Sequence, residues 1–242
     1  MHLNKPIVSV VMAVFNAKDF LPQSIESILS QTYIDFEFII IDDGSTDTSW
    51  RIISEYHKTD KRIRPLKMEI NQGIAMASNI GINAARGKYI ARMDADDISL
   101  PQRLKKQITF MENNPDIGVL GSRVRYMDSA GNLLGSPPMS LKDLSIRWDL
   151  LFKSPFFNSS TIFRNSLLSK YKNVYKPNAR YGEDYDLWIR LLSFTKGENL
   201  PDILLNYRLH SSNLTHTTQN SLKKEVLFTS LAVKTHIKNN SI

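Results

Sequence analysis

Cysteine is absent from this 242-residue chain, and no stretch of it forms an apolar run long enough to cross a membrane. Without thiols, the chain cannot form disulfide bridges, thiolate zinc sites or a cysteine nucleophile. A membrane-spanning helix needs roughly 20 consecutive apolar residues. Hydrophobic residues make up 42% of the chain and charged residues 23%, which is ordinary for a globular protein. These properties predict a globular protein with a sizeable core, located in the cytoplasm.

A concentrated basic segment is also lacking. The formal net charge is +7, but the positive residues are scattered along the chain. A protein with such a charge can bind nucleic acid, an anionic membrane surface or an anionic small substrate. The sequence carries no helix-turn-helix, zinc-finger or aromatic RNA-binding signature, so we expect no nucleic-acid partner. An anionic substrate or an anionic membrane surface remains as the explanation of the charge.

The first half of the chain alternates between apolar runs and helical spacing. The run at 7–14 is continuous, as expected for a strand buried on both faces. Strands are expected at 7–14, 36–41, 63–68, 88–93 and 117–126, and helices near 21–29, 47–57, 73–86 and 100–111. This alternation predicts an α/β fold with a mostly parallel, Rossmann-like sheet and helices on both faces. Ligands of such sheets bind beyond the carboxyl ends of the strands.

The second half is less regular. Helices are expected at 141–151, 183–194 and 221–237, and strands at 159–163 and 203–209. The 221–237 helix is basic and amphipathic, which is compatible with peripheral contact with the inner face of an anionic membrane. Ordinary packing with a solvated charged face explains the same pattern. The sequence shows no linker, so the two halves should pack as one unit.

Acidic residues follow two of the predicted strands. Asp42 and Asp43 end the second strand, and Asp94, Asp96 and Asp97 end the fourth. Aspartate is common in turns and helix caps, which could explain either cluster alone. Two clusters at one sheet edge repel each other unless a cation lies between them. Carboxylate oxygens suit Mg²⁺ or Mn²⁺, and such a metal can bridge two phosphates of a nucleotide.

An ordered set of motifs covers roughly residues 5 to 210 and ends with two acidic motifs, Met93-Asp-Ala-Asp-Asp97 and Gly182-Glu-Asp-Tyr-Asp-Leu-Trp188. The earlier motifs are PIVSVVMAVFN (6–16), LSQT (29–32), IIIDDGSTD (39–47), NQG (71–73) and ARGKYI (85–90). This set resembles the family 2 glycosyltransferases, which have the GT-A fold. The first acidic motif resembles the Asp-x-Asp motif of that family and the second its acceptor-side motif.

The resemblance implies a donor site for a nucleotide-sugar, expected to be a UDP-sugar. Asp42 would face the base, Asp43 would support that loop, and Asp94 would face the ribose and the metal. Asp96 would be the main ligand of Mn²⁺ or Mg²⁺, with His210 as a further metal ligand. The expected donor-site residues are Ala13, Phe15, Asp42, Asp43, Asn71, Gly73, Asp94, Ala95 and Asp96.

The resemblance also implies an acceptor side. Asp184 would be the general base that takes the proton of an acceptor hydroxyl, with inversion at the anomeric carbon. Glu183 and Asp184 can also be explained as acids that favour a helix start. Relatives often carry His-Pro or His-Ser where Asn158-Ser-Ser160 stands here, so the acceptor contacts are left open. Trp148 is a candidate for stacking on a sugar ring, whereas Trp188 fits a buried pattern.

The sequence therefore predicts an inverting glycosyltransferase that builds bacterial surface polysaccharide or lipopolysaccharide. Its acceptor would be a saccharide or a lipid-linked saccharide. Residues 1–126 would bind the nucleotide-sugar, and residues 127–242 would form the acceptor-binding subdomain with the C-terminal helix. Two alternatives stay open. A sugar nucleotidyltransferase would need a glycine-rich loop where Ala13-Val-Phe-Asn-Ala17 stands, and a non-catalytic nucleotide- or carbohydrate-binding protein would not need Asp96 and Asp184.

Overall fold

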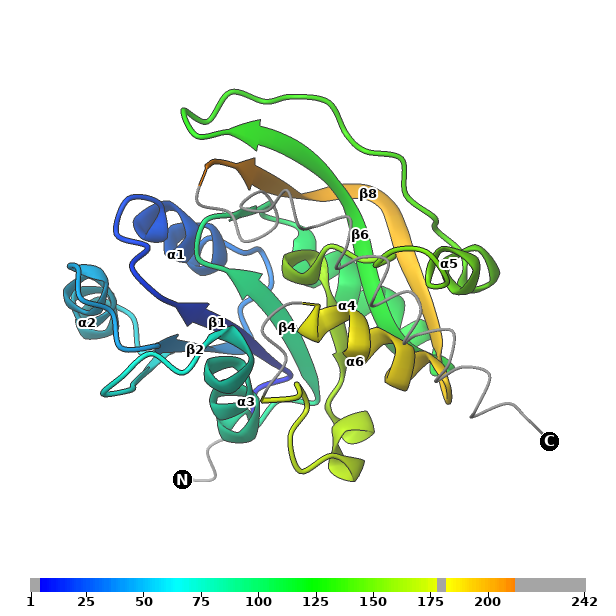
Figure 1. The fold of residues 1–242 in the computed structure, drawn as a ribbon, viewed down its shortest axis with the longest axis horizontal. Helices are drawn as coiled ribbons and strands as arrows, with labels where there is room; N and C mark the ends of the chain where they lie inside the picture. The colour runs from blue at the N-terminus through cyan, green and yellow to red at the C-terminus, as the bar shows by residue number, and fades with distance from the viewer. Residues whose placement is uncertain (1–4, 178–181, 212–242) are drawn as a thin grey trace.

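The computed structural model describes residues 5–177 and 182–211. It shows one curled sheet of eight strands flanked by helices (Figure 1). The strand order is β3-β2-β1-β4-β7-β6-β8-β5. The helix expected at 221–237 lies outside the described residues. Within them, no helix is both long and apolar enough to span a bilayer.

The first four strands form the parallel half of the sheet, as the sequence predicts. β1 lies at the centre, with β2 on one side and β4 on the other, and β3 extends beyond β2. The bounds are Val8–Val14 for β1, Phe36–Asp42 for β2, Ile63–Lys67 for β3 and Tyr89–Asp94 for β4. The connecting helices are α1 (Leu21–Leu29), α2 (Ser49–Thr59), α3 (Ile74–Ala84) and α4 (Arg103–Asn113).

The other half of the sheet is mixed, so the expectation of a mostly parallel sheet applies to only part of it. β7 (Ile162–Arg164) runs antiparallel to both β4 and β6 (Ile117–Asp128). β8 (Lys196–Leu209) pairs parallel to β6, and the short β5 (Ile98–Ser99) pairs antiparallel to β8. The strand expected at 159–163 is a 3₁₀ turn, Asn158–Ser160, followed by β7.

Two apolar layers hold the helices on the sheet because neighbouring strand residues face opposite ways. On one face, Val10 and Met12 of β1 pack with residues of α1, α2 and α4. On the other face, Val11 packs with residues of α3, α5 (Asp143–Asp149) and α6 (Glu183–Leu192). Each layer buries strand side chains from both halves of the sheet. The division at residue 126 stays a prediction, and β6 runs across it.

Two local expectations differ from the structure. The helix expected near 100–111 begins only at Arg103, as α4, so Pro101 precedes it. The strand expected from residue 203 begins at Lys196 instead, because β8 continues through Pro201. The pairing of β8 with β6 shifts register between Ser122 and Arg123, which accommodates a residue that cannot donate a backbone hydrogen bond.

Candidate active site

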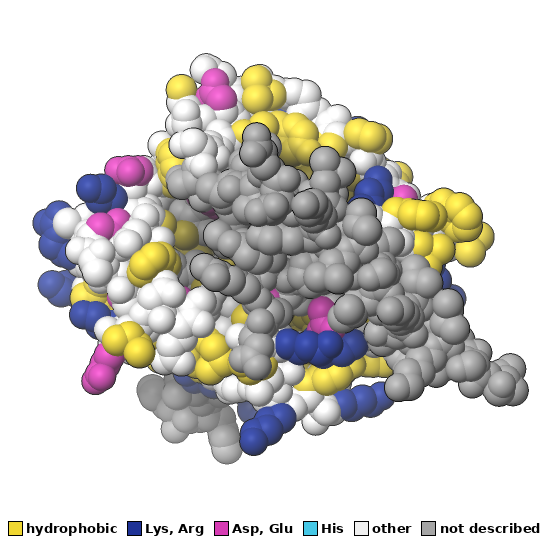
Figure 2. All heavy atoms as spheres, in the orientation of Figure 1, with side chains coloured by type: hydrophobic (Ala, Val, Ile, Leu, Met, Phe, Trp, Pro, Cys, Tyr) yellow, Lys and Arg dark blue, Asp and Glu magenta, His cyan; other side chains and the backbone are white. Residues whose placement is uncertain are grey.

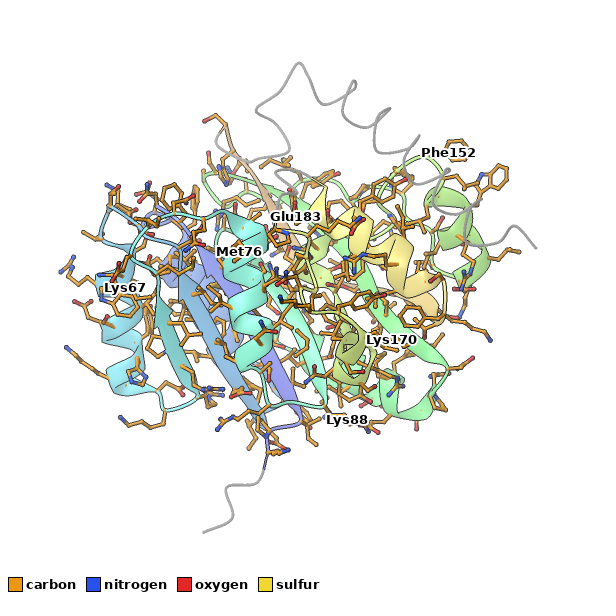
Figure 3. The ribbon with its side chains drawn as sticks, turned by 60° about the horizontal axis from the view of Figure 1, so that its bottom comes forward. Lys67, Met76, Lys88, Phe152, Lys170 and Glu183 are labelled. Carbon is orange, nitrogen blue, oxygen red and sulfur yellow. The ribbon has the colours of Figure 1, made fainter. Side chains whose placement is uncertain are left out.

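The carboxyl ends of three parallel strands bring the two acidic clusters to one edge of the sheet. In the strand register, Val14 of β1 lies opposite Asp42 of β2, and Ala13 lies opposite Asp94 of β4. Figure 3 shows Glu183, at the start of α6, at this same end of the sheet, and Lys88, just before β4, at the opposite end. The predicted donor and acceptor residues therefore share one edge.

Asp42 and Asp43 occupy different environments, although they are adjacent. Asp42 is fully buried, and neither of its carboxylate oxygens has a hydrogen-bond partner among the described residues. Asp43 accepts hydrogen bonds from the backbone N–H groups of Gln72 (2.8 Å) and Gly73 (2.9 Å). Burial raises the pKa of Asp43 despite these two bonds. Asp43 thus fixes the loop that leads into α3, and Asp42 offers two unused acceptors.

Asn16 is a structural residue of this edge that sequence reasoning did not single out. Its φ is +49°, in the left-handed region that asparagine tolerates better than most residues. Its Oδ1 accepts the backbone N–H of Thr46 (2.8 Å), and its own N–H donates to Ser45 Oγ (3.0 Å). Lys18 N–H donates to Asp47 Oδ2 (3.1 Å). These bonds tie the loop after β1 to the loop after β2.

Asp94 is the acidic residue at the end of β4. Arg92, two residues earlier and on the same face of the strand, is fully buried and places Nη2 3.8 Å from Asp94 Oδ1. Burial raises the pKa of Asp94 to about 6, and the charges of Asp96 and Asp184 add to the rise while Arg92 opposes it. Asp94 therefore interacts electrostatically with both the donor-side and the acceptor-side acids.

Asp96 is held from the end of β8. His210 Nε2 lies 3.0 Å from Asp96 Oδ2, and Arg208 Nε donates to the Asp96 carbonyl (2.7 Å). Arg208 Nη2 also donates to Gln23 Oε1 (2.7 Å), and its guanidinium lies 4.5 Å from the ring of Phe20. Arg208 is thus buried and bonded to the backbone of this loop.

Asp97 anchors the same loop from inside the protein. Its carboxylate accepts hydrogen bonds from Ser159 Oγ and from the backbone N–H of Arg208 (2.9 Å), and its carbonyl accepts one from Ser24 Oγ. Burial, together with Asp96 and Asp94, raises the pKa of Asp97 well above its ordinary value. The loop after β4 is therefore fastened to α1, β8 and the turn before β7.

The acceptor-side acids lie in the first turn of α6. Gly182, with φ +68°, precedes the helix, and the N–H of Tyr185 donates to Asp184 Oδ1 (2.8 Å). Burial raises the pKa of Asp184, whereas the N–H groups of the helix start and Arg92 act against the rise. Burial and Asp184 raise the pKa of Glu183 to about 7. Asp186 is bound elsewhere, to Lys176 (2.5 Å) and Arg190 (2.7 Å).

The three predicted metal ligands are of the chemical type that Mn²⁺ and Mg²⁺ accept, namely two carboxylates and an imidazole. Asp96 and His210 meet directly, and the repulsion between Asp94 and Asp96 would be relieved by a cation. Across residues 5–177 and 182–211, no three acidic or imidazole groups converge as a ready metal site. The residues therefore fit a metal whose remaining ligands come from water and substrate phosphates, as is usual for Mg²⁺.

The remaining candidates differ in exposure. Phe15 is 48% exposed and Asn71 is exposed, whereas Ala95 is buried and Ala13 and Gly73 are partly buried. Trp188 is fully buried among core residues, as the sequence suggested. Trp148 is 67% exposed on α5, where Figure 2 shows hydrophobic side chains gathered at the surface.

The sequence matches known transferases over most of its length. The model of Glycosyl transferase family 2 matches residues 9–171. An uncharacterized glycosyltransferase of Methanocaldococcus jannaschii is 39% identical over 98% of this chain and 82% of its own. The O-antigen biosynthesis glycosyltransferase WbnJ of Escherichia coli is 34% identical over 86% of this chain and 81% of its own. WfaP of Escherichia coli, named as a UDP-Glc:alpha-D-GlcNAc-diphosphoundecaprenol beta-1,3-glucosyltransferase, is 31% identical over 95% of this chain and 88% of its own.

Solved structures share the fold at lower identity. TarS 1–349 of S. aureus, in complex with UDP-GlcNAc, aligns with a TM-score of 0.79 at 18% identity over 97% of this chain and 68% of its own. The mannosyltransferase PcManGT of Pyrobaculum calidifontis, in complex with GDP-Man and Mn²⁺, aligns with a TM-score of 0.72 at 14% identity over 96% of this chain and 65% of its own. These likenesses show the GT-A fold. Because the family match covers residues 9–171 and relatives at 31–39% identity align along nearly all of the chain, it belongs to glycosyl transferase family 2 and is a glycosyltransferase.

Proposed function

We propose that this enzyme transfers a sugar from a UDP-sugar to an acceptor hydroxyl with inversion at the anomeric carbon. The observation that carries the proposal is the gathering of acids at one edge of the sheet, where Asp42 ends β2 and Asp94 ends β4 on either side of β1. Asp184, in the first turn of α6, lies near enough for its charge to raise the pKa of Asp94. Donor-side and acceptor-side acids in such proximity suit a reaction that joins two substrates.

The donor nucleotide would lie across the ends of β1, β2 and β4. The two unused carboxylate oxygens of Asp42 suit the N–H groups of a base such as uracil. Ala13 and Phe15 would line the nucleoside pocket, and the Asp43-bound loop would bring Asn71 and Gly73 beside it. Asp94, Ala95 and Asp96 would face the ribose and the diphosphate.

Asp94, Asp96 and His210 would hold Mn²⁺ or Mg²⁺. A bound divalent ion offsets the negative charge that develops on the departing diphosphate. The chain's own contribution is the rigid loop after β4, which Arg208 and Asp97 fasten to β8. This loop would keep Asp96 in one place while the nucleoside diphosphate departs and the sugar passes to the acceptor.

Asp184 would act as the general base. A base works best when its pKa lies near the operating pH, and burial raises the pKa of Asp184 in that direction. It would accept the proton of the acceptor hydroxyl as the oxygen attacks the anomeric carbon. Attack from the face opposite the nucleotide inverts the configuration of that carbon.

The names of the relatives support an acceptor in bacterial surface glycans. One relative is named for O-antigen biosynthesis, one for teichuronic acid biosynthesis, and one for transfer to a diphosphoundecaprenol-linked sugar. We extend this to the present chain as synthesis of surface polysaccharide or lipopolysaccharide on a saccharide or lipid-linked saccharide. Peripheral contact with the inner face of the cytoplasmic membrane would bring the enzyme to such an acceptor.

The test is UDP release from a panel of UDP-sugars with Mn²⁺ in the wild type, Asp96→Ala and Asp184→Asn. Asp186→Asn is the matched control, because it lies on the same helix but is bound to Lys176 and Arg190. We expect both site variants to lose at least a hundredfold in kcat and the control to stay within threefold. Metal-independent UDP binding by Asp96→Ala at wild-type affinity would remove the metal role, and full turnover by Asp184→Asn would remove the base.

A further inference from the structure

Arg92 is an unusual residue for the interior of a sheet. Its side chain is fully buried in the middle of β4, between the core and the acidic edge. Of its donors, Nη1 bonds to the Val11 carbonyl (3.1 Å), and Nε has no hydrogen-bond partner among the described residues. A buried arginine is normally paired and fully bonded, because desolvating its charge is costly. The burial of an incompletely bonded guanidinium at this position therefore needs an explanation.

The acids around Arg92 explain why a cation is buried here. Nη2 lies 3.8 Å from Asp94 Oδ1, which is an ion-pair contact rather than a hydrogen bond. The charge of Arg92 also acts on Glu183 and Asp184 at the start of α6, where it favours the ionised carboxylates. The buried guanidinium thus forms an ion pair with Asp94 of β4, and its charge reaches the acids of α6. These two elements carry the donor-side and acceptor-side residues of the proposed reaction.

The position of this cation is fixed by its neighbours. The guanidinium lies 5.6 Å from the ring centre of Tyr175, a buried residue of the segment before α6. Asn79 of α3 holds Tyr175 in place with two backbone bonds, at 2.7 and 2.8 Å. Arg103 of α4 donates to the Arg92 carbonyl (2.7 Å) and so fixes its backbone. Three elements therefore hold Arg92 where both sets of acids can share it.

We propose that Arg92 is a positioning residue of the transfer reaction: its buried guanidinium pairs with Asp94 and packs against Tyr175, which lies just before α6, and so fixes the end of β4 relative to Asp184. This inference rests on the proposed roles of those two acids. It predicts a role that depends on the positive charge of residue 92 and on the length of its side chain. An apolar side chain of similar volume should preserve the fold and lower kcat.

The experiment compares Arg92→Met and Arg92→Lys with Arg164→Met. Arg164 is the matched control because it is a partly buried arginine that bonds to the carbonyls of Ile117, Met111 and Asn114, at the end of the sheet away from the acids. The substrate is whichever of UDP-glucose, UDP-galactose, UDP-N-acetylglucosamine and GDP-mannose the wild type hydrolyses fastest with Mn²⁺. We expect Arg92→Met to lower kcat about thirtyfold with less than a threefold change in donor KM, and Arg92→Lys to recover most of that loss.

A double-mutant cycle separates positioning from stability. In the Asp184→Asn background, Arg92→Met should reduce kcat less than threefold further, whereas Arg164→Met should change kcat by the same factor in both backgrounds. Thermal unfolding midpoints show whether any loss follows folding. The inference is overturned if Arg92→Met retains wild-type kcat, if its effect is fully additive with Asp184→Asn, or if Arg92→Lys recovers stability without activity. An inactive Asp184→Asn beside an unimpaired Arg92→Met would leave the proposed function intact and remove only Arg92.

Discussion

His210 Nε2 and Asp96 Oδ2 lie 3.0 Å apart and join the end of β8 to the loop after β4. The ring of His210 also packs 4.9 Å from that of Phe20, which precedes α1. Imidazole and carboxylate are thus held together by residues from three separate parts of the sequence. If they share a divalent ion, the loss of either should be visible in the metal requirement.

We therefore expect His210→Ala to raise the Mn²⁺ concentration for half-maximal activity by roughly tenfold, since groups that ligate or orient a metal typically contribute 10- to 100-fold. The measurement is a Mn²⁺ titration of UDP release at saturating donor. His57→Ala is the control. His57 lies on α2, its imidazole bonds to the Ile63 carbonyl of β3, and it has no place in the loop after β4. An unchanged Mn²⁺ titration in His210→Ala would remove His210 from the metal site.

The buried carboxylate of Asp97 should matter for stability. Asp97→Ala leaves Ser159 Oγ and the Arg208 N–H without their acceptor, and unpaired buried partners cost about 3 kcal/mol of unfolding free energy. Urea unfolding gives this value. Asp116→Ala, which removes an exposed carboxylate paired with Lys196, should leave the transition unchanged. Equal stability of the two variants would contradict the anchoring role of Asp97.

Glu183 should make stability depend on pH. Its pKa is raised from 4.5 to about 7, so above pH 7 the folded protein carries a desolvated carboxylate that the unfolded chain hydrates freely. As pH falls through 7 the folded state takes up a proton and gains stability, and the gain is complete once the pH is below 4.5. Between pH 8 and pH 6 we expect the wild type to gain roughly 1 kcal/mol relative to Glu183→Gln.

Urea unfolding of both proteins at the two pH values measures this difference. Glu55→Gln on α2 is the control, because that side chain is 58% exposed and should follow the wild type. If the wild type instead gains stability relative to Glu183→Gln as pH rises from 6 to 8, the sign is wrong and Glu183 is stabilised as the ion.

Gly44 should tolerate no side chain. Its φ is +67°, and an added Cβ would lie 2.6 Å from the backbone carbon of Ile70. Gly131 also has a positive φ, +92°, but a Cβ there would meet nothing within 4 Å. We expect Gly131→Ala to cost about 1 kcal/mol from backbone strain alone and Gly44→Ala about 3 kcal/mol, because the clash adds to the strain. Only Gly44→Ala should also weaken UDP binding, measured by calorimetry, since it displaces the loop that Asp43 holds.

The sequence predicts the parallel half of the sheet well because its signals are local. β1, β2 and β4 are mostly apolar, and parallel strands that end at one edge bring Asp42 and Asp94 to that edge without further information. The mixed half depends on contacts between distant segments. β8 passes through Pro201, which local propensity treats as the end of a strand, and only the irregular pairing with β6 makes that acceptable.

The candidate site is also only partly predictable from the sequence. The order of the motifs identifies the acidic residues, but it does not show which groups surround them. The unbonded Nε of Arg92 and the Asn16 bridge between two loops arise from neighbours far away in sequence. For Asn16 the available signal was an asparagine directly after a strand, because asparagine is enriched at positions with positive φ. The strand period places Arg92 on the same face as Asp94, but nothing local in the sequence indicates that Arg92 is fully buried.

The fastening of the loop after β4 to the end of β8 has a consequence for how such enzymes diverge. Asp96 and Asp97 are supported by β4, α1 and the last residues of β8, with Ser159 as one further support of Asp97. The stretch between β6 and β8 carries α5, α6 and their connecting segments on one face of the sheet. Apart from Ser159 and β7, which pairs with β4, that stretch can accept insertions and substitutions without moving the supports of this loop. If the proposed roles hold, selection for a new glycan can act on α5 and α6 while the loop that would hold the donor is inherited unchanged.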